Sequence, residues 1–253
     1  MKPLALLLLL APALASAEDC KHEDRRLLEP SLEGVSTVRF EVNSHDLHLA
    51  GGADGAPASL EVRACASDAD YLPQLVVATR REGDTLVVTL ERQGQSTGIF
   101  FSPTYANLRV DATLPAGLAY QVDVGSGDAE VRGVSRLDAD VGSGDLVAHG
   151  IGGEVAASVG SGDIEIDGAG SLFLHSVGSG DVQARRIGGD ARIDSVGSGD
   201  VELEQVGGNV AVGRVGSGDV DVVDVRGDLT ARRVGSGEVS HRGVRGRVDV
   251  PAD

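Results

Sequence analysis

Val124-Gly125-Ser126-Gly127-Asp128 is the stretch that decides the fold, because it recurs six more times along the chain. The motif V-G-S-G-D starts again at Val141, Val159, Val177, Val196 and Val215, and V-G-S-G-E starts at Val234. Successive starts lie 17, 18, 18, 19, 19 and 19 residues apart. Repetition at such a short and nearly fixed period is typical of stacked units that each pack only on their neighbours.

Each repeat also contains a second, weaker glycine turn, as in Ile151-Gly152-Gly153. Between the turns, apolar and polar residues alternate in short runs, which is the period of a β-strand. We therefore predict an all-β fold, a single-stranded parallel β-helix or β-solenoid with 17–19-residue coils. Equivalent residues of neighbouring coils should then stack about 4.8 Å apart.

The region before the first motif carries a diverged copy of the repeat. Val42-Asn43-Ser44-His45-Asp46-Leu47 aligns with Val141-Gly142-Ser143-Gly144-Asp145-Leu146. Asn and His tolerate positive φ better than most residues, so we expect both glycines of G-S-G at or near positive φ. Residues 35–123 should form an irregular β region that is continuous with the regular repeats of residues 124–253. Within that region, the strand-like runs on either side of residues 81–84 predict a hairpin.

The N-terminus predicts export. Residues 1–17 combine one Lys, an apolar run and Ala15-Ser16-Ala17, which is the pattern of a secretory signal peptide with its cleavage site. Residues 18–34 should follow as a strap or one helical turn. The two cysteines, Cys20 and Cys65, should pair as a disulfide in an oxidising compartment. We expect a periplasmic or extracellular, cell-surface location.

Charge and hydropathy limit the possible partners. The formal net charge is −17 at pH 7, and removing residues 1–17 with their single Lys makes it −18. Such a chain repels nucleic acid and anionic lipid, so we predict no nucleic-acid partner. The apolar run of the leader is too short to span a bilayer, and no later stretch approaches 18 uninterrupted apolar residues, so we predict no membrane span.

The repeat and its lead-in resemble the bacterial putative adhesin family, β-solenoid domains of unknown function. The likeness lies in Asn107-Leu108-Arg109-Val110-Asp111-Ala112-Thr113-Leu114-Pro115 followed by V-x-V-G-S-G-D-x-x-V, and it continues through every later half-repeat, over about residues 35–250. The resemblance implies a β-solenoid and an adhesin-like role. It carries over no catalytic residue.

The last residue of each motif forms a predicted ladder of acids along one edge: Asp128, Asp145, Asp163, Asp181, Asp200, Asp219 and Glu238. Two unit charges about 4.8 Å apart repel by roughly 0.9 kcal/mol in water, so something must relieve the repulsion. The favoured interpretation is that each Asp caps its own turn by accepting a backbone N–H. The alternative is a Ca²⁺ ladder like that of G-G-x-G-x-D-x-U-x repeats, although the acid spacing here differs.

Catalytic candidates are weak. The motif serines lack a recurring His to act as a base, and G-S-G is not the G-x-S-x-G nucleophile turn. His45 and His48 could be drawn as a metal pair, but on a strand they would point to opposite faces. Enzymes built on β-helices need long loops that form a cleft, and these coils are short and uniform. We predict no catalytic residues, no enzyme activity and no cofactor, with Ca²⁺ as the alternative.

An aromatic segment is the least repetitive feature, with Phe100, Phe101 and Tyr105 close together. Stacked coils need a cap, so we expect the segment to cover one end or side of the rod, and an exposed partner-binding patch is the alternative.

The sequence therefore predicts an exported, non-enzymatic structural or interaction module, adhesin-like, that binds an unidentified protein or glycan through flat repeated faces. Two alternatives stay open. One is a calcium-stabilised secreted repeat protein, and the other is a periplasmic envelope accessory protein that binds a protein partner through the aromatic segment.

Overall fold

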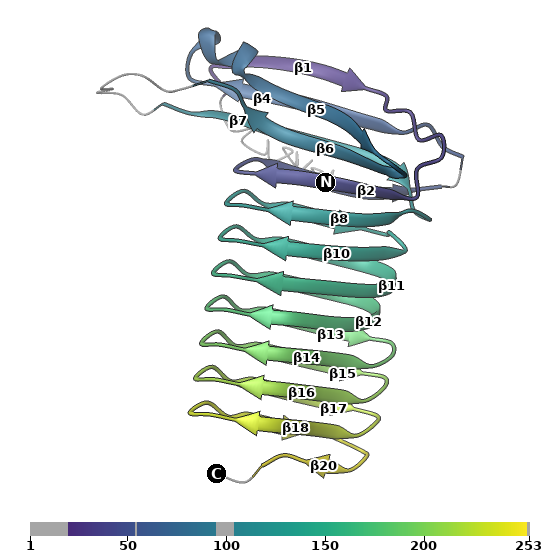
Figure 1. Ribbon diagram of the computed structural model, residues 1–253, viewed down its shortest axis with the longest axis vertical. Coiled ribbons are helices and arrows are strands. Elements are labelled where there is room, and N and C mark those ends of the chain that lie inside the picture. The colour runs from purple at the N-terminus through teal and green to yellow at the C-terminus, as the bar shows by residue number, and fades with distance from the viewer. Residues whose placement is uncertain (1–19, 54, 95–103, 252–253) are drawn as a thin grey trace, which may run out of the picture.

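The computed structural model describes residues 20–53, 55–94 and 104–251, and these form a rod of stacked β-strands (Figure 1). The predicted all-β fold is confirmed, because the chain is a parallel β-solenoid of about 7 turns with coils of about 19 residues. The only helical element among the described residues is the short 3-10 helix η1 (Ala69–Gln74).

Each coil contributes one strand to each of two faces. The first face stacks β2 (Thr37–Asn43), β8 (Ala119–Val124), β10 (Arg136–Val141), β14 (Ala191–Val196), β16 (Val210–Val215), β18 (Leu229–Val234) and β20 (Val248–Asp249). The second face stacks β3 (Asp46–Gly52), β9 (Ala129–Arg132), β13 (Val182–Ile187), β15 (Val201–Val206), β17 (Val220–Val225) and β19 (Val239–Arg242). Two long strands, β11 (Leu146–Val159) and β12 (Ile164–Val177), bend from the second face to the first.

The N-terminal coils do not stack in chain order. β2 lies between β6 (Thr85–Arg92) and β8, and β3 lies between β7 (Ala106–Pro115) and β9. The coil made by β2 and β3 is therefore inserted between two coils that come later in the sequence. The diverged repeat at Val42–Leu47 forms the turn of this inserted coil, so the solenoid does continue into the N-terminal region.

Antiparallel strands close the N-terminal end of the rod. On the first face β5 (Leu75–Glu82) pairs antiparallel with β6, which is the predicted hairpin. On the second face β4 (Ser59–Ala66) pairs antiparallel with β7, and β1 (His22–Leu28) pairs antiparallel with β4. Residues 22–28, within the segment expected as a strap or helical turn, instead form an edge strand whose backbone pairs with β4 along its whole length.

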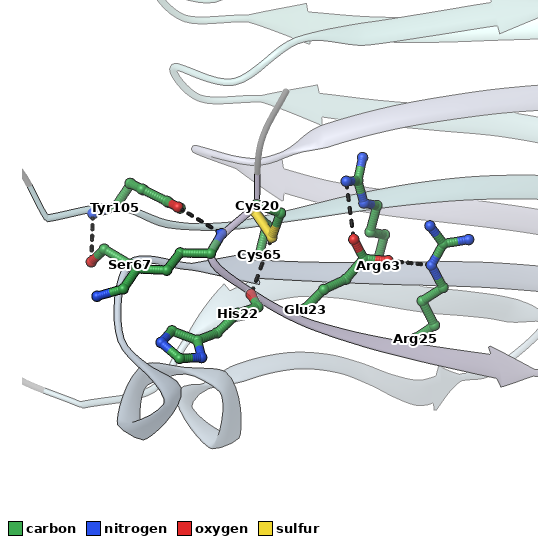
Figure 2. The surroundings of a disulfide bond; sticks show 9 residues. Cys20, His22, Glu23, Arg25, Arg63, Cys65, Ser67 and Tyr105 are labelled. Carbon is green, nitrogen blue, oxygen red and sulfur yellow. Dashed lines mark hydrogen bonds and ion pairs between the residues drawn. A yellow bond between two sulfur atoms is a disulfide. The ribbon is translucent and has the colours of Figure 1, made fainter. Parts of the chain in front are cut away.

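A disulfide ties this end together, joining Cys20, just before β1, to Cys65 in β4 (Figure 2). Beside it, the Tyr105 hydroxyl accepts the backbone N–H of Lys21 at 3.0 Å, and the Tyr105 N–H donates to the Ser67 hydroxyl at 3.2 Å. The residues just before β1 are therefore held both to β4 and to the residue that precedes β7.

A continuous core of aliphatic side chains runs along the rod between the two faces. Inward residues are mostly Val, Leu, Ile and Ala, and the two large aromatic ones, Phe40 and Tyr120, lie near the N-terminal end. The Tyr120 hydroxyl donates a hydrogen bond to the Pro115 carbonyl at 2.7 Å, so this polar group is paired. Small inward side chains allow the two faces to approach closely at interior packing density.

The prediction of positive φ for the G-S-G glycines is wrong. Among the described residues none of these glycines has positive φ, whereas Asn43, at the matching place in the inserted coil, has φ 57°. Their backbone is constrained by stacking instead. A Cβ on the second glycine of a motif would overlap the carbonyl oxygen of its counterpart one coil earlier, as Gly144 would overlap Gly127.

Two alanine substitutions should separate stacking from backbone conformation. Gly150 has φ 62° and nothing within 4 Å of an added Cβ, so Gly150→Ala should cost about 1–2 kcal/mol of backbone strain. Gly144→Ala has to push two coils apart, so we expect a larger loss of unfolding free energy, measured by urea denaturation. Equal losses in the two variants would contradict the stacking explanation.

Candidate functional site

The seven ladder acids stack along the edge where the motif turns lie, and their side chains connect neighbouring coils. The Oδ1 atom of each aspartate accepts the backbone N–H of the next ladder residue, at 2.8–3.2 Å, in six successive bonds from Asp128 to Glu238. The expectation that each aspartate caps its own turn is therefore wrong. The turn amides donate instead to carbonyls of the preceding coil, as Ser143 does to Gly125 at 2.7 Å.

A second ladder of the same kind, not predicted from the motif, runs along the opposite turn. Asp190 Oδ1 accepts the N–H of Asn209 at 2.7 Å, Asn209 Oδ1 accepts that of Asp228 at 2.9 Å, and Asp228 Oδ1 accepts that of Arg247 at 2.7 Å. The signal was the 19-residue spacing of these residues directly after the second glycine turn. Short side chains with an oxygen two bonds from Cβ suit this bond in both ladders.

His45 and His48, which were considered as a pair of metal ligands, have different surroundings. His45 is 2% exposed, and its Nδ1 atom accepts the N–H of Leu108 at 3.2 Å. His48 lies on the exposed surface, where its Nδ1 atom is 2.9 Å from Asp111 Oδ1. Among the described residues, no group of three or more His, Cys, Asp or Glu side chains could hold a metal ion.

The aromatic segment is described only in part. Phe100 and Phe101 lie outside the described residues, so the choice between a cap and a partner-binding patch stays a prediction for them. Tyr105 is 40% exposed and makes the bonds to Lys21 and Ser67 beside the disulfide (Figure 2). The motif serines are exposed in every turn.

A strip of carboxylates lies on the second face beside the acid ladder. Two residues after each ladder acid, one outward residue per coil stacks in register, and the column reads Glu130, Val147, Glu165, Gln183, Glu202, Asp221 and Ser240. We call this column and the seven ladder acids together the acidic strip. Adjoining shallow hollows of about 400, 270 and 160 Å³ follow its N-terminal and middle coils.

The basic side chains near the acidic strip are fewer than its acids. Arg132 pairs with Glu130, and Arg185 pairs with Glu165. Burial raises the pKa of Asp46, which occupies the matching place in the inserted coil, and Arg109 beside it acts in the opposite direction. The strip thus keeps a strong negative potential over several coils, and a surface of one sign attracts ligands of the other.

The comparisons establish the fold and no more. No family model and no curated protein matches the chain. The solved structure of a putative adhesin from Parabacteroides merdae is similar, with a TM-score of 0.54 and 12% identity, over 91% of this chain and 96% of that one. A putative adhesin from Parabacteroides distasonis gives 0.47 and 16%, over 91% and 95%.

The resemblance to putative adhesins is thereby confirmed at the level of the fold. The chain is a member of the class of capped parallel β-solenoids with two flat faces. No helix among the described residues is long and apolar enough to cross a membrane.

His45 should make stability depend on pH. Burial lowers its pKa below the ordinary value of 6.5, and the nearby Arg92 lowers it further. The unfolded chain therefore binds a proton at His45 more readily than the folded chain, so stability falls as pH drops below about 6.5. Between pH 7.5 and pH 5 the melting temperature of the wild type should fall by about 2–4 °C more than that of His45→Gln, which keeps an acceptor. The exposed His241→Gln variant is the control, and the same pH dependence in all three proteins would refute the role of His45.

The ladder bond predicts different effects for two substitutions of Asp163. Asp163→Asn keeps the acceptor oxygen, as Asn209 does in the second ladder, so its melting temperature should match the wild type. Asp163→Ala loses the bond and should melt about 2–4 °C lower.

Melts of the same three proteins in EDTA and in millimolar Ca²⁺ test the alternative. A ligand stabilises a protein only when it binds the folded state preferentially. We expect no calcium dependence, because the ladder aspartates already accept backbone N–H groups. A calcium-dependent rise that Asp163→Asn abolishes would make the acid ladder a metal site.

Proposed function

We propose that the protein is an exported, non-enzymatic interaction module, adhesin-like, that binds a positively charged protein surface through the acidic strip. The observation that carries this proposal is that every coil adds a ladder acid to the acidic strip, and that four coils add a second carboxylate in the adjoining column, at Glu130, Glu165, Glu202 and Asp221. At least one acid per coil gives a long strip of negative charge, which suits contact with an extended partner better than the positioning of one small substrate.

Export is supported by two features of the N-terminal end. The first 17 residues have the pattern of a secretory leader. The disulfide between Cys20 and Cys65 is the kind of bond that persists in the periplasm or outside the cell, where thiols are not kept reduced. A location at the cell surface or in the periplasm follows from this proposal.

A binding role is favoured over catalysis by the bonding of the ladder. Each ladder aspartate uses one carboxylate oxygen to hold the next coil, so its position is fixed by the fold. The other oxygen stays on the exposed edge, where it adds to the potential that attracts a cationic partner. Complementary charge chiefly raises association rates and selects partners, and it weakens with salt.

A charge-neutralised variant tests the strip. Glu165→Gln/Glu202→Gln/Asp221→Asn removes three carboxylates from the strip and leaves the ladder intact. Binding of a fluorescent ten-residue oligolysine, measured by anisotropy at low salt and again at 150 mM salt, should weaken about tenfold or more in this variant, because three close charge contacts are lost.

The matched control is Asp123→Asn/Asp138→Asn/Asp140→Asn, which removes the same charge from the first face and should change affinity less than about twofold. Equal weakening in both variants would mean that the peptide senses only net charge. Unchanged binding in the strip variant would rule the strip out as the binding surface.

A further inference from the structure

Three consecutive coils hold a non-glycine residue in the left-handed backbone region at the same place. The residue five positions after each ladder acid has positive φ, and in most coils it is glycine, as at Gly150 (62°) and Gly168 (86°). In the coils that follow, this place is taken by Arg186 (58°), Gln205 (60°) and Asp224 (57°). Side chains in this conformation are strained, and such strain concentrates where a side chain has a role.

These three residues form one wall of a groove at the turn opposite the acid ladder. The groove has a volume of about 480 Å³. Gly188 and Gly207 form part of its lining two residues further along their coils, where they add no side chain. The equivalent residues of the next two coils are Arg226 and Arg245, which also line the groove. The two glycines thus leave open space in the groove, and the two arginines place guanidinium groups at one end of that space.

The charges of the groove are unusual for this chain. Its lining holds Arg186, Arg226 and Arg245 against the single acid Asp224, although the whole protein carries a net charge of −17. Arg186 is ion-paired with Asp167. Within the described residues, neither Arg226 nor Arg245 forms an ion pair. Two guanidinium groups one coil apart repel each other, and a shared anion would relieve that repulsion.

We propose that this groove binds one oxyanion group, a carboxylate or sulfate, on an acidic sugar unit of a glycan. Arg226 and Arg245 bind the oxyanion, because a guanidinium fork matches the oxygens of such a group. Arg186 and Gln205 donate to the sugar hydroxyls from the strained wall. The volume falls in the range of sites for small ligands. This site is separate from the acidic strip, has the opposite charge, and does not depend on the proposed function.

Titration calorimetry with the purified protein tests the site, using a sulfated heparin disaccharide, glucuronate and inorganic sulfate as probes. We expect the disaccharide to bind, and Arg226→Gln/Arg245→Gln to weaken it about tenfold or more. The control is Arg214→Gln/Arg233→Gln, an in-register arginine pair on β16 and β18 that also forms no ion pair within the described residues. It removes the same charge elsewhere and should leave the affinity within about twofold.

Glycine at a strained position gives a second, independent readout. Gln205→Gly should melt at the wild-type temperature or higher, because strain is relieved without loss of an ion pair, yet bind the disaccharide more weakly. Weaker binding with unchanged or higher stability supports the site, since a damaged fold would lower both.

Three results would overturn the proposal. One is no binding of the disaccharide or of glucuronate. Another is equal weakening by the two arginine double variants, which would show a response to net charge only. The third is inorganic sulfate binding as tightly as the disaccharide, which would make the groove a site for a free anion.

Discussion

The close contact between the motif turns of neighbouring coils is the constraint on which the rest of the structure depends. The second glycine of each motif leaves no room for a side chain, because the carbonyl oxygen of its counterpart occupies that space. At this distance the turn amides donate to the preceding coil, and each aspartate reaches the N–H of the next ladder residue. This contact sets the register of the strands on both faces. The outward columns and the aliphatic core therefore depend on a contact between backbones.

The same constraint explains why an acidic edge is compatible with stability. Stacked carboxylates repel, but each of the six ladder aspartates accepts a hydrogen bond from an N–H of the next coil. Hydrogen bonds to a charged acceptor are stronger than those between neutral groups, so they offset part of this repulsion. The second ladder at the opposite turn uses Asn209 for one coil, which shows that the bond needs an oxygen acceptor and does not need a charge.

Much of this fold could be predicted from the repeat, and the reasons for the exceptions are physical. The fixed period predicts stacking, and alternation predicts which residues lie inside. The order of the N-terminal coils could not be predicted, because β2 and β3 satisfy the same alternation wherever they are inserted. Sequence alone does not show which glycines have positive φ, since close backbone approach and a left-handed conformation both select glycine. Gly144 is an example of the first cause and Gly150 of the second. The candidate sites are harder to predict from the sequence than the fold, because an outward column or a groove joins residues from separate coils.

The near-identity of the coils has a consequence for how such a protein changes over time. A coil of 17 to 19 residues, gained or lost as a whole, lengthens or shortens the rod by about 4.8 Å and keeps the ladder in register. An insertion of any other length would move the ladder aspartates off their edge. The length of the rod can therefore change in steps, by duplication or deletion of one repeat in the gene, while the outward residues of the other coils stay the same.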